Sequence, residues 1–372
     1  MTARSFLYPH IQALQGTLDI TLVANVMGPD PMPTPRLRFN LFPVRIHRKI
    51  HLFEDLRAVL VLYRLFRREK FDIVHSVTPK AGLLAMCAAK LAGVPIRVHW
   101  FTGQVWATQS GPKRWFLKAL DHLTAALATQ VLVDSPSQRD FLISERVIRG
   151  ASSEVLAHGS VCGVDPDRFH PSEDVSARIR GQLGVPQDAV VLIYAGRLNK
   201  DKGIEDLAKA FSSLAARLPK LWLVLVGPDE QNMWVAVSEI CSNWMGRVCR
   251  LDHTDQPEQY MAAADIFCLP SYREGFGSAA IEAASCALPT VATRIYGLVD
   301  AVEEGASGFL HTPGDVDGLA GLIERLYADP HLRVSMGLRG RSRAIKLFGQ
   351  EALTTALMSF YARILQNYES RS

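Results

Sequence analysis

The stretch Val190–Phe211 has the sequence VVLIYAGRLNKDKGIEDLAKAF, and it decides the fold class. Its first six residues are apolar without alternation, which is typical of a strand buried on both faces of a parallel sheet. Gly196 ends this run, a polar turn follows, and apolar periodicity predicts a helix over Glu205–Leu218. Strand, glycine turn and helix form the unit from which open α/β sheets are built.

The same alternation of short apolar runs and amphipathic helices extends over the 372 residues. Further strands are predicted at Ile20–Val26, Phe71–Ser76, Ile96–Trp100, Val131–Asp134, Leu221–Val226, Ile266–Leu269 and Thr290–Ala292. Helices between them include Leu56–Arg68, Trp115–Leu127 and Val316–Tyr327. The sequence therefore predicts an α/β fold with parallel sheets.

A polar turn that contains two prolines, Asp165–Pro171, separates two such series. We predict two Rossmann-like, doubly wound domains that face a cleft. They are an N-terminal domain of residues 1–170 and a second domain of residues 171–350, and a helix over 351–372 packs back on the first. The first domain opens with a predicted helix, Arg4–Leu14, where a strand and a glycine turn are usual. We therefore expect its first strand to be missing; either the fold is unusual or the recorded start lies downstream of the real one.

Composition excludes several classes of protein. The chain is 48% hydrophobic and 21% charged, as expected for a globular protein, and no apolar run approaches the ~20 residues of a membrane span. Its six cysteines form no C-x-x-C pair, which favours reduced thiols in a cytosolic protein. Residues 1–170 hold 21 Lys and Arg against 13 Asp and Glu, so this half predicts an anionic partner. Nucleic acid is disfavoured because no recognition motif is present.

Two cations follow the strand Val190–Ala195. Arg197 and Lys202 come after Gly196, where a glycine lets a ligand approach the backbone closely. Arg holds a phosphate through two parallel hydrogen bonds, and Lys acts as a point charge. A phosphate-binding turn and a merely solvated basic turn both fit this segment alone.

A second glycine turn follows the predicted strand Ile266–Leu269 and leads into a helix that begins near Ser278. The amides of Gly275 and Gly277, together with the helix N-terminus, suit a diphosphate. Glu282 shares a helix face with Ser278 and is suited to ribose hydroxyls, while Glu274 in the loop is suited to sugar hydroxyls. The alternative is that Glu274 is a charge at the start of the helix and Glu282 a solvated residue.

Glu274 and Glu282 in an E-x7-E frame, with Gly196-Arg197 and Lys202-Gly203 upstream, resemble family 4 of the retaining glycosyltransferases, which have the GT-B fold. The resemblance covers almost the whole chain and includes Val226–Pro228, Ala264-Asp265, Pro270-Ser271, Gly297 and Gly308–Leu310. It implies metal-independent transfer from a nucleoside diphosphate sugar with retained configuration.

The resemblance also implies roles for individual residues. Arg197 and Lys202 would hold the diphosphate and offset the charge of the leaving group. Glu282 would bind ribose and Glu274 the transferred sugar. Backbone amides near Phe276, Gly277 and Ser278 would cap the phosphates, and Gly196 and Leu251 complete the predicted donor-binding set. Ala287, where glycine is usual, and Asp252 near the base pocket depart from the family pattern.

The first half resembles the branch that builds O-antigen and capsular polysaccharides, whose acceptors are typically sugars on a polyprenyl diphosphate. Lys80, Thr102 and His99 are the predicted acceptor-binding residues. Thr102 stands where many members have a histidine. Lys80 has the alternative of a surface lysine at a helix start, and His99 the alternative of a core residue.

No cofactor and no metal are expected. The two D-x-D sequences, Asp165–Asp167 and Asp315–Asp317, are better explained as a turn and a helix cap. The predicted helix Leu56–Arg68 carries an apolar stripe and several cations, which fits either docking on an anionic membrane or packing on the sheet.

We therefore predict an enzyme that transfers a hexosyl or N-acetylhexosaminyl group, with UDP as the favoured carrier, to a lipid-linked glycan. We expect it in the cytoplasm, peripherally on the inner face of the cell membrane. The rival functions are a nucleotide-sugar 2-epimerase or sugar-phosphate transferase, and a non-catalytic protein that binds sugar nucleotides.

Overall fold

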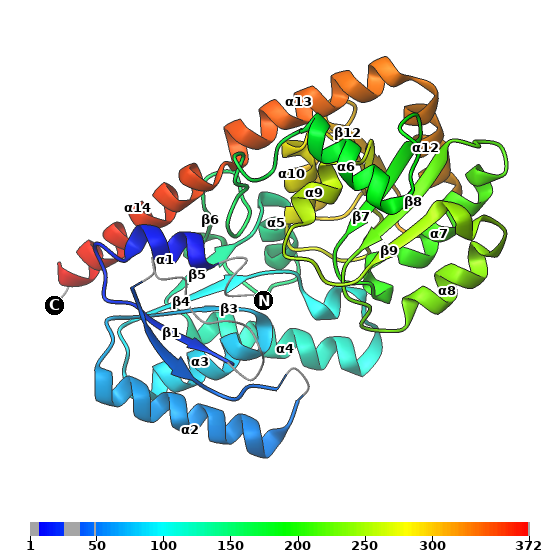
Figure 1. Ribbon diagram of the computed structural model, residues 1–372. Helices are drawn as coiled ribbons and strands as arrows, with labels where there is room; N and C mark the ends of the chain where they lie inside the picture. The colour runs from blue at the N-terminus through cyan, green and yellow to red at the C-terminus, as the bar shows by residue number, and fades with distance from the viewer. Residues whose placement is uncertain (1–6, 26–37, 48–49, 371–372) are drawn as a thin grey trace. The chain divides into compact units, whose positions relative to one another are not determined.

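The computed structural model describes residues 7–25, 38–47 and 50–370 (Figure 1). The chain forms two compact units, one of residues 1–162 with 350–372 and one of residues 163–349. Each unit has its own parallel sheet and hydrophobic core. The α/β class with parallel sheets is as the sequence predicts.

The second unit contains a six-stranded parallel sheet in the order β12-β11-β10-β7-β8-β9. These strands are β7 (Val190–Ala195), β8 (Leu221–Val226), β9 (Val248–Leu251), β10 (Ile266–Leu269), β11 (Thr290–Thr293) and β12 (Gly308–His311). The order is that of a doubly wound Rossmann domain, since strands are added outward in both directions from β7. The predicted bounds of β7, β8 and β10 are confirmed.

Helices cover both faces of this sheet. They are α6 (Glu173–Leu183), α7 (Ile204–Ala215), α8 (Met233–Ile240), α9 (Pro257–Ala262), α10 (Ser278–Ser285), α11 (Leu298–Ala301), α12 (Val316–Ala328) and α13 (Pro330–Phe348). Side-chain caps fix where several of them begin. The Asp315 carboxylate accepts the Gly318 amide at 2.8 Å at the start of α12, and Asp329 accepts the Leu332 amide at 2.9 Å at the start of α13.

Residues 163–170, assigned to the first domain by the sequence, pack in the second unit. The Val164 amide donates to the Phe348 carbonyl at 2.8 Å. Phe169 belongs to the core of the second unit, and its carbonyl accepts the Ser285 hydroxyl at 2.6 Å. The proline-bearing turn is therefore a packed part of this unit, and the two units divide between Cys162 and Gly163.

The first unit has two parallel sheets. One pairs β1 (Thr21–Ala24) with β2 (Asn40–Pro43), and the other has the order β3-β4-β5-β6. Its strands are β3 (Ile73–Val77), β4 (Ile96–Phe101), β5 (Gln130–Val133) and β6 (Ser153–Val155). Omitting strand 1 from the doubly wound order 3-2-1-4-5-6 leaves groups of two and three strands, and the second sheet of this unit has one strand more than that. Among the described residues β1 pairs with β2 and β3 with β4, and no strand joins the two sheets.

The helices of the first unit are α1 (Tyr8–Leu14), α2 (Leu52–Glu69), α3 (Pro79–Ala92), α4 (Gly111–Leu127), α5 (Pro136–Ser144) and the C-terminal α14 (Gln350–Glu369). Helix α14 packs beside α1, as Figure 1 shows in red and blue. Leu353, Leu357 and Phe360 of α14 are buried against β4 residues such as Trp100. The end of the chain is thus part of the first unit.

Helix α2 has two apolar surfaces. Ala58, Leu62, Leu65 and Phe66 are buried in the core. Leu52, Phe53, Leu56 and Leu60 are exposed, with Phe53 at 91%. Within the predicted helix Leu56–Arg68, Phe66 packs inward whereas Leu56 and Leu60 face outward. No helix within the described ranges has the length and hydropathy that a membrane span requires.

All six cysteines are free thiols, as predicted. Burial raises the pKa of the thiols of Cys241 and Cys286, to about 11 and about 12, so these groups are protonated at neutral pH.

Candidate active site

The predicted donor residues follow two neighbouring strands. Strands β7 and β10 pair directly, although the chain forms β8 and β9 between them. This is the point at which the strand order reverses, and open α/β sheets bind ligands at the carboxyl ends of the strands there. The Tyr272 amide after β10 donates to the Asp201 carbonyl after β7 at 2.8 Å, so the two loops are bonded together.

Glycine is required where these loops approach each other. Gly203 has φ 66°, and a β-carbon at this position would collide with the carbonyl of Pro270. Gly277 has φ 86°, and a β-carbon there would collide with Leu298 of α11. Both glycines of the sequence motifs therefore allow a close approach of elements within the site.

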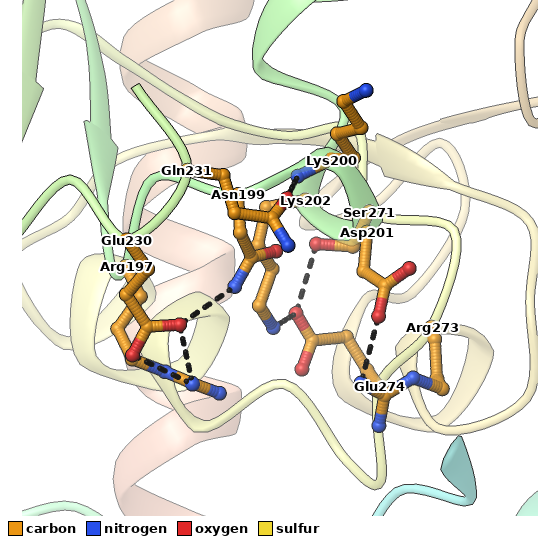
Figure 2. Close-up of polar contacts among 10 residues, drawn as sticks. All are labelled: Arg197, Asn199, Lys200, Asp201, Lys202, Glu230, Gln231, Ser271, Arg273 and Glu274. Atoms are coloured by element: carbon orange, nitrogen blue, oxygen red, sulfur yellow. Dashed lines mark hydrogen bonds and ion pairs between the residues drawn. The ribbon is translucent and has the colours of Figure 1, made fainter. Parts of the chain in front are cut away.

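Lys202 is paired with Glu274 across the two loops. The Lys202 ammonium donates to the Glu274 carboxylate, and the Ser271 hydroxyl donates to the same oxygen at 2.8 Å. Figure 2 shows these three groups in a row. The pair is largely enclosed, with Lys202 17% and Glu274 14% exposed. The structure thus brings together two of the three predicted catalytic residues.

Arg197, the third, has a different carboxylate partner. Its guanidinium donates to both carboxylate oxygens of Glu230, at 2.9 and 3.1 Å (Figure 2). The Asn199 amide donates to Glu230 at 3.4 Å. Glu230 lies in the loop after β8, and the sequence analysis missed it because it belongs to no motif.

Two further side-chain contacts fix the loops. Arg273 donates to the Asp201 carboxylate at 2.9 Å, again between the loops after β10 and β7 (Figure 2). The Tyr272 hydroxyl donates to Asp206 of α7 at 2.6 Å, and this hydrogen bond, with burial, raises the pKa of Tyr272 to about 12. These contacts fix the loop after β10 to the loop after β7 and to α7.

The helix α10 begins at Ser278, as the sequence predicts, with Gly277 as its N-cap. The Phe276 side chain is buried and packs edge-on against Phe348, with ring centroids 5.0 Å apart. Phe276 can therefore face a ligand only through its backbone. The amides at a helix N-terminus, together with the helix dipole, favour an anion.

Glu282 lies one turn further along α10 and is partly buried. No hydrogen bond to its carboxylate is found within the described residues. Burial raises its pKa to about 7; the charge of Arg168 opposes this shift and that of Glu258 adds to it. Arg168 itself is paired with Glu258 at 2.9 Å. An unsatisfied acceptor on this helix is suited to hydroxyl donors.

The other donor residues lie at strand ends. Gly196 follows β7, and its amide donates to the Val226 carbonyl at 2.8 Å. Leu251 ends β9 and is partly buried, and its carbonyl accepts the Gly227 amide at 3.0 Å. Asp252 after it is exposed and pairs with Arg250 at 2.5 Å.

His99 is a core residue of the first unit. It is 1% exposed, and its Nδ1 lies 2.8 Å from the Ser76 hydroxyl. Burial lowers its pKa to about 3, so its imidazole is neutral. Its ring lies against Gly82 of α3, where a β-carbon would collide with it. His99 therefore supports α3 and does not face a ligand, which corrects its place in the predicted acceptor set.

Lys80 and Thr102 lie after neighbouring strands of the first unit. The Lys80 ammonium pairs with Asp55 of α2 at 2.6 Å and joins α3 to α2. The Thr102 carbonyl accepts hydrogen bonds from the side-chain amides of Gln104 at 2.5 Å and Gln138 at 2.6 Å.

Thr78, just before α3, has φ 78°, and this conformation strains a β-branched residue by ~1–3 kcal/mol.

Both D-x-D sequences have a structural role. Asp165 accepts the amides of Asp167 and Arg168, at 3.0 and 3.3 Å, in a turn. Asp315 caps α12. The turn and cap that the sequence predicts are both present.

Both halves of the chain match family models. Residues 175–343 match glycosyl transferases group 1, and residues 10–159 match the glycosyl transferase 4-like domain. The capsular polysaccharide biosynthesis glycosyltransferase CapM of Staphylococcus aureus is 30% identical over 329 residues, which cover 88% of this chain and 86% of CapM. The chain belongs to glycosyltransferase family 4.

Two further proteins illustrate how far the likeness extends. The UDP-Gal:alpha-D-GlcNAc-diphosphoundecaprenol alpha-1,3-galactosyltransferase of Escherichia coli is 27% identical, over 94% of this chain and 90% of that enzyme. Sucrose-phosphate synthase of Thermosynechococcus elongatus has the same fold, with a TM-score of 0.80 at 23% identity, over 96% of this chain and 92% of that one. The fold of this glycosyltransferase is thus the GT-B type.

Proposed function

We propose that this glycosyltransferase moves a sugar from a UDP-sugar to a glycan carried on a polyprenyl diphosphate, with retained anomeric configuration and without a metal ion. The observation that carries the proposal is the arrangement in the second unit. Arg197 and Lys202 lie at the strand-order reversal with the N-terminus of α10, and Glu282 lacks a hydrogen-bond partner among the described residues. The diphosphate of a nucleoside diphosphate matches the two cations and the helix N-terminus, and its ribose matches Glu282.

In this proposal the protein supplies the positive charge that other enzymes take from a metal ion. Arg197 and Lys202 bind the diphosphate and stabilise the charge that develops when the bond to the sugar breaks. The amides of Gly277 and Ser278 donate to the phosphate oxygens. Glu274, released from Lys202, accepts hydrogen bonds from the hydroxyls of the sugar, and Glu282 accepts those of ribose.

The choice of carrier and acceptor rests on the relatives. CapM is named for capsular polysaccharide synthesis, and the E. coli relative for UDP-galactose and an N-acetylglucosamine on diphosphoundecaprenol. A lipid-linked acceptor places the reaction at a membrane. We therefore propose a role in cell-surface polysaccharide synthesis at the cytoplasmic face of the cell membrane.

Exposed apolar side chains in the first unit support membrane contact. Leu52, Phe53 and Leu56 of α2 are between 61% and 91% exposed, and Trp115 of α4 is 73% exposed. Cations such as Arg57 and Arg64 share α2 with them. Apolar side chains next to cations are suited to the interface of an anionic membrane.

The test is a transfer assay with UDP-, GDP- and ADP-sugars in excess EDTA, with lipid-linked acceptors and product analysis by NMR. We expect turnover with a UDP-sugar and a product of retained configuration. Lys202→Ala should lower kcat/KM by about 100-fold or more because it removes a charge that stabilises the leaving group. Lys200→Ala is the matched control, since Figure 2 shows the Lys200 ammonium pointing away from the network.

Absence of transfer and hydrolysis with every donor would refute the proposal. Equal activity of Lys202→Ala and Lys200→Ala would refute the site. A sugar isomerised without any acceptor would instead favour an epimerase.

A further inference from the structure

The loop that carries Glu230 is bonded to the loop that carries Arg197. The Leu198 amide donates to the Pro228 carbonyl at 2.9 Å, and the Glu230 amide donates back to the Leu198 carbonyl at 3.0 Å. The Lys200 amide donates to the Gln231 side chain at 2.9 Å. These bonds continue the pairing of β7 with β8 beyond the strands, so the two loops have a fixed register.

Asp229 holds the backbone on either side of Glu230. Its carboxylate accepts the amides of Gln231 at 3.2 Å, Met233 at 2.8 Å and Trp234 at 2.9 Å, at the start of α8. Burial alone would raise the pKa of Asp229, but these bonds outweigh it and hold the pKa below its usual value. The Asp229 carboxylate is therefore ionised at neutral pH. Glu230 is therefore presented to Arg197 by a turn whose conformation is fixed.

The Arg197–Glu230 contact uses the groups that a phosphate would need. Both Glu230 oxygens accept from the same guanidinium nitrogen, and a phosphate oxygen also binds such N–H groups. Arg197 is 39% and Glu230 27% exposed, so the pair remains accessible to a competing anion. Glu230 occupies the N–H groups of Nη1, so a phosphate gains these donors only when the contact opens.

Lys202, the second cation of the site, has a different kind of partner from Arg197. The partner of Lys202 is Glu274, which belongs to the sugar-binding motif and which Ser271 also holds. Glu230 lies on another loop and outside every motif of the donor site. Its negative charge opposes the binding of a diphosphate beside Arg197.

We propose that Glu230 is an internal counter-ion that competes with the donor diphosphate for Arg197 and thereby sets the affinity for the nucleotide. In the free enzyme Glu230 holds and positions the Arg197 side chain. On binding, Arg197 exchanges Glu230 for the diphosphate, and on product release it returns. The inference rests on the proposed function only in taking the anion to be a diphosphate.

The experiment compares Glu230→Gln with the wild-type protein by calorimetric titration with inorganic pyrophosphate, UDP and uridine. Glutamine keeps the size of the side chain but loses its charge. We expect pyrophosphate and UDP to bind about two- to fivefold more tightly to the variant, the range set by an exposed ion pair. Uridine, which lacks the diphosphate, should bind unchanged.

Glu304→Gln is the matched control. Glu304 pairs with Arg294 at 2.5 Å, and both are exposed in the same unit and belong to none of the loops after β7, β8 and β10. If the tighter binding came only from a smaller negative charge on the second unit, Glu304→Gln would show tighter binding as well. We expect no change in UDP affinity, whereas Glu230→Ala should reproduce the gain.

Steady-state kinetics separate competition from a purely structural role. Competition predicts that the KM for the donor falls with kcat nearly unchanged, since the substrate and transition state gain equally. Unchanged or weaker pyrophosphate binding in Glu230→Gln would overturn the inference. If Glu230→Gln binds pyrophosphate more tightly but neither protein binds UDP, the proposed donor is refuted and the counter-ion role remains supported.

Discussion

Glu282 is the residue whose charge depends most on its surroundings within the candidate site. Its pKa is raised to about 7 mainly by burial, so near neutral pH the carboxyl is about half ionised. The ionised form accepts stronger hydrogen bonds from ribose hydroxyls than the protonated form. Affinity for UDP should therefore rise as the pH increases from 6 to 8, and Glu282→Gln should lose this part of the dependence.

Calorimetric titrations of both proteins with UDP over this pH range check the prediction. The phosphates of UDP titrate near pH 6 as well, but they do so equally with both proteins. The difference between the two pH profiles thus isolates residue 282. Parallel profiles would show that Glu282 does not contact the nucleotide.

At this scale the sequence predicted the placement of the candidate donor residues better than that of the candidate acceptor residues. Lys202 and Glu274 follow strands that pair in the sheet, so their positions in the sequence imply that they meet. His99 instead lies in a strand, where alternate residues face opposite sides, and a sequence does not show which helix will cover it. Glu230 meets Arg197 through the pairing of β7 with β8, which was visible only as two separate apolar runs.

The turn between α10 and β11 is an element with a local conflict. Ala287, where the family pattern has glycine, has φ 61°. The left-handed conformation costs an alanine ~1–2 kcal/mol, and glycine avoids this cost. Glycine also has greater freedom in the unfolded chain, which offsets part of the gain. Ala287→Gly should therefore stabilise the protein by ~0.5–1 kcal/mol, measured by urea denaturation.

Ala328→Gly is the control for this substitution. Ala328 is exposed and ends α12, so glycine there should destabilise by up to ~1 kcal/mol. Opposite signs for the two variants are expected. Destabilisation by both would show that residue 287 does not need the left-handed conformation.

Helix α2 is the element on which we expect membrane binding to depend. Phe53→Ser with Leu56→Ser removes two of its exposed apolar side chains without touching the buried face. Burial of such side chains in the interface favours binding, so we expect the affinity for vesicles with anionic phospholipid to fall about tenfold or more in a flotation assay.

Leu91→Ser provides the control for α2, because Leu91 is 69% exposed near the end of α3. We expect this variant to bind vesicles as the wild type does. An equal loss in both variants, or no loss in either, would contradict a docking role of α2.

At the scale of the whole molecule, alternation of strands and helices predicted the fold because every strand of a parallel sheet needs a crossover. Strands β2, β6, β9 and β12 were not predicted. They have three or four residues each and contain polar ones, as in Ser153–Val155, so no apolar run marks them. Their pairing comes from neighbouring strands and not from their own sequence.

In the first unit β1 and β2 form a sheet of their own, and this has a consequence for stability. Two strands alone are marginally stable, whereas β7 is paired on both sides in a six-stranded sheet. Amides of Thr21–Ala24 should therefore exchange with solvent at least about 100-fold faster than those of Val190–Ala195, measured by hydrogen exchange with mass spectrometry. Equal protection would mean that a further strand pairs with β1.

The most direct measurement is a crystal structure of the protein with bound UDP. The account predicts the diphosphate against Arg197, Lys202 and the first turn of α10, the Arg197–Glu230 pair opened, and the ribose hydroxyls on Glu282. UDP bound elsewhere on the second unit, or a diphosphate that leaves both cations with their carboxylates, would contradict it.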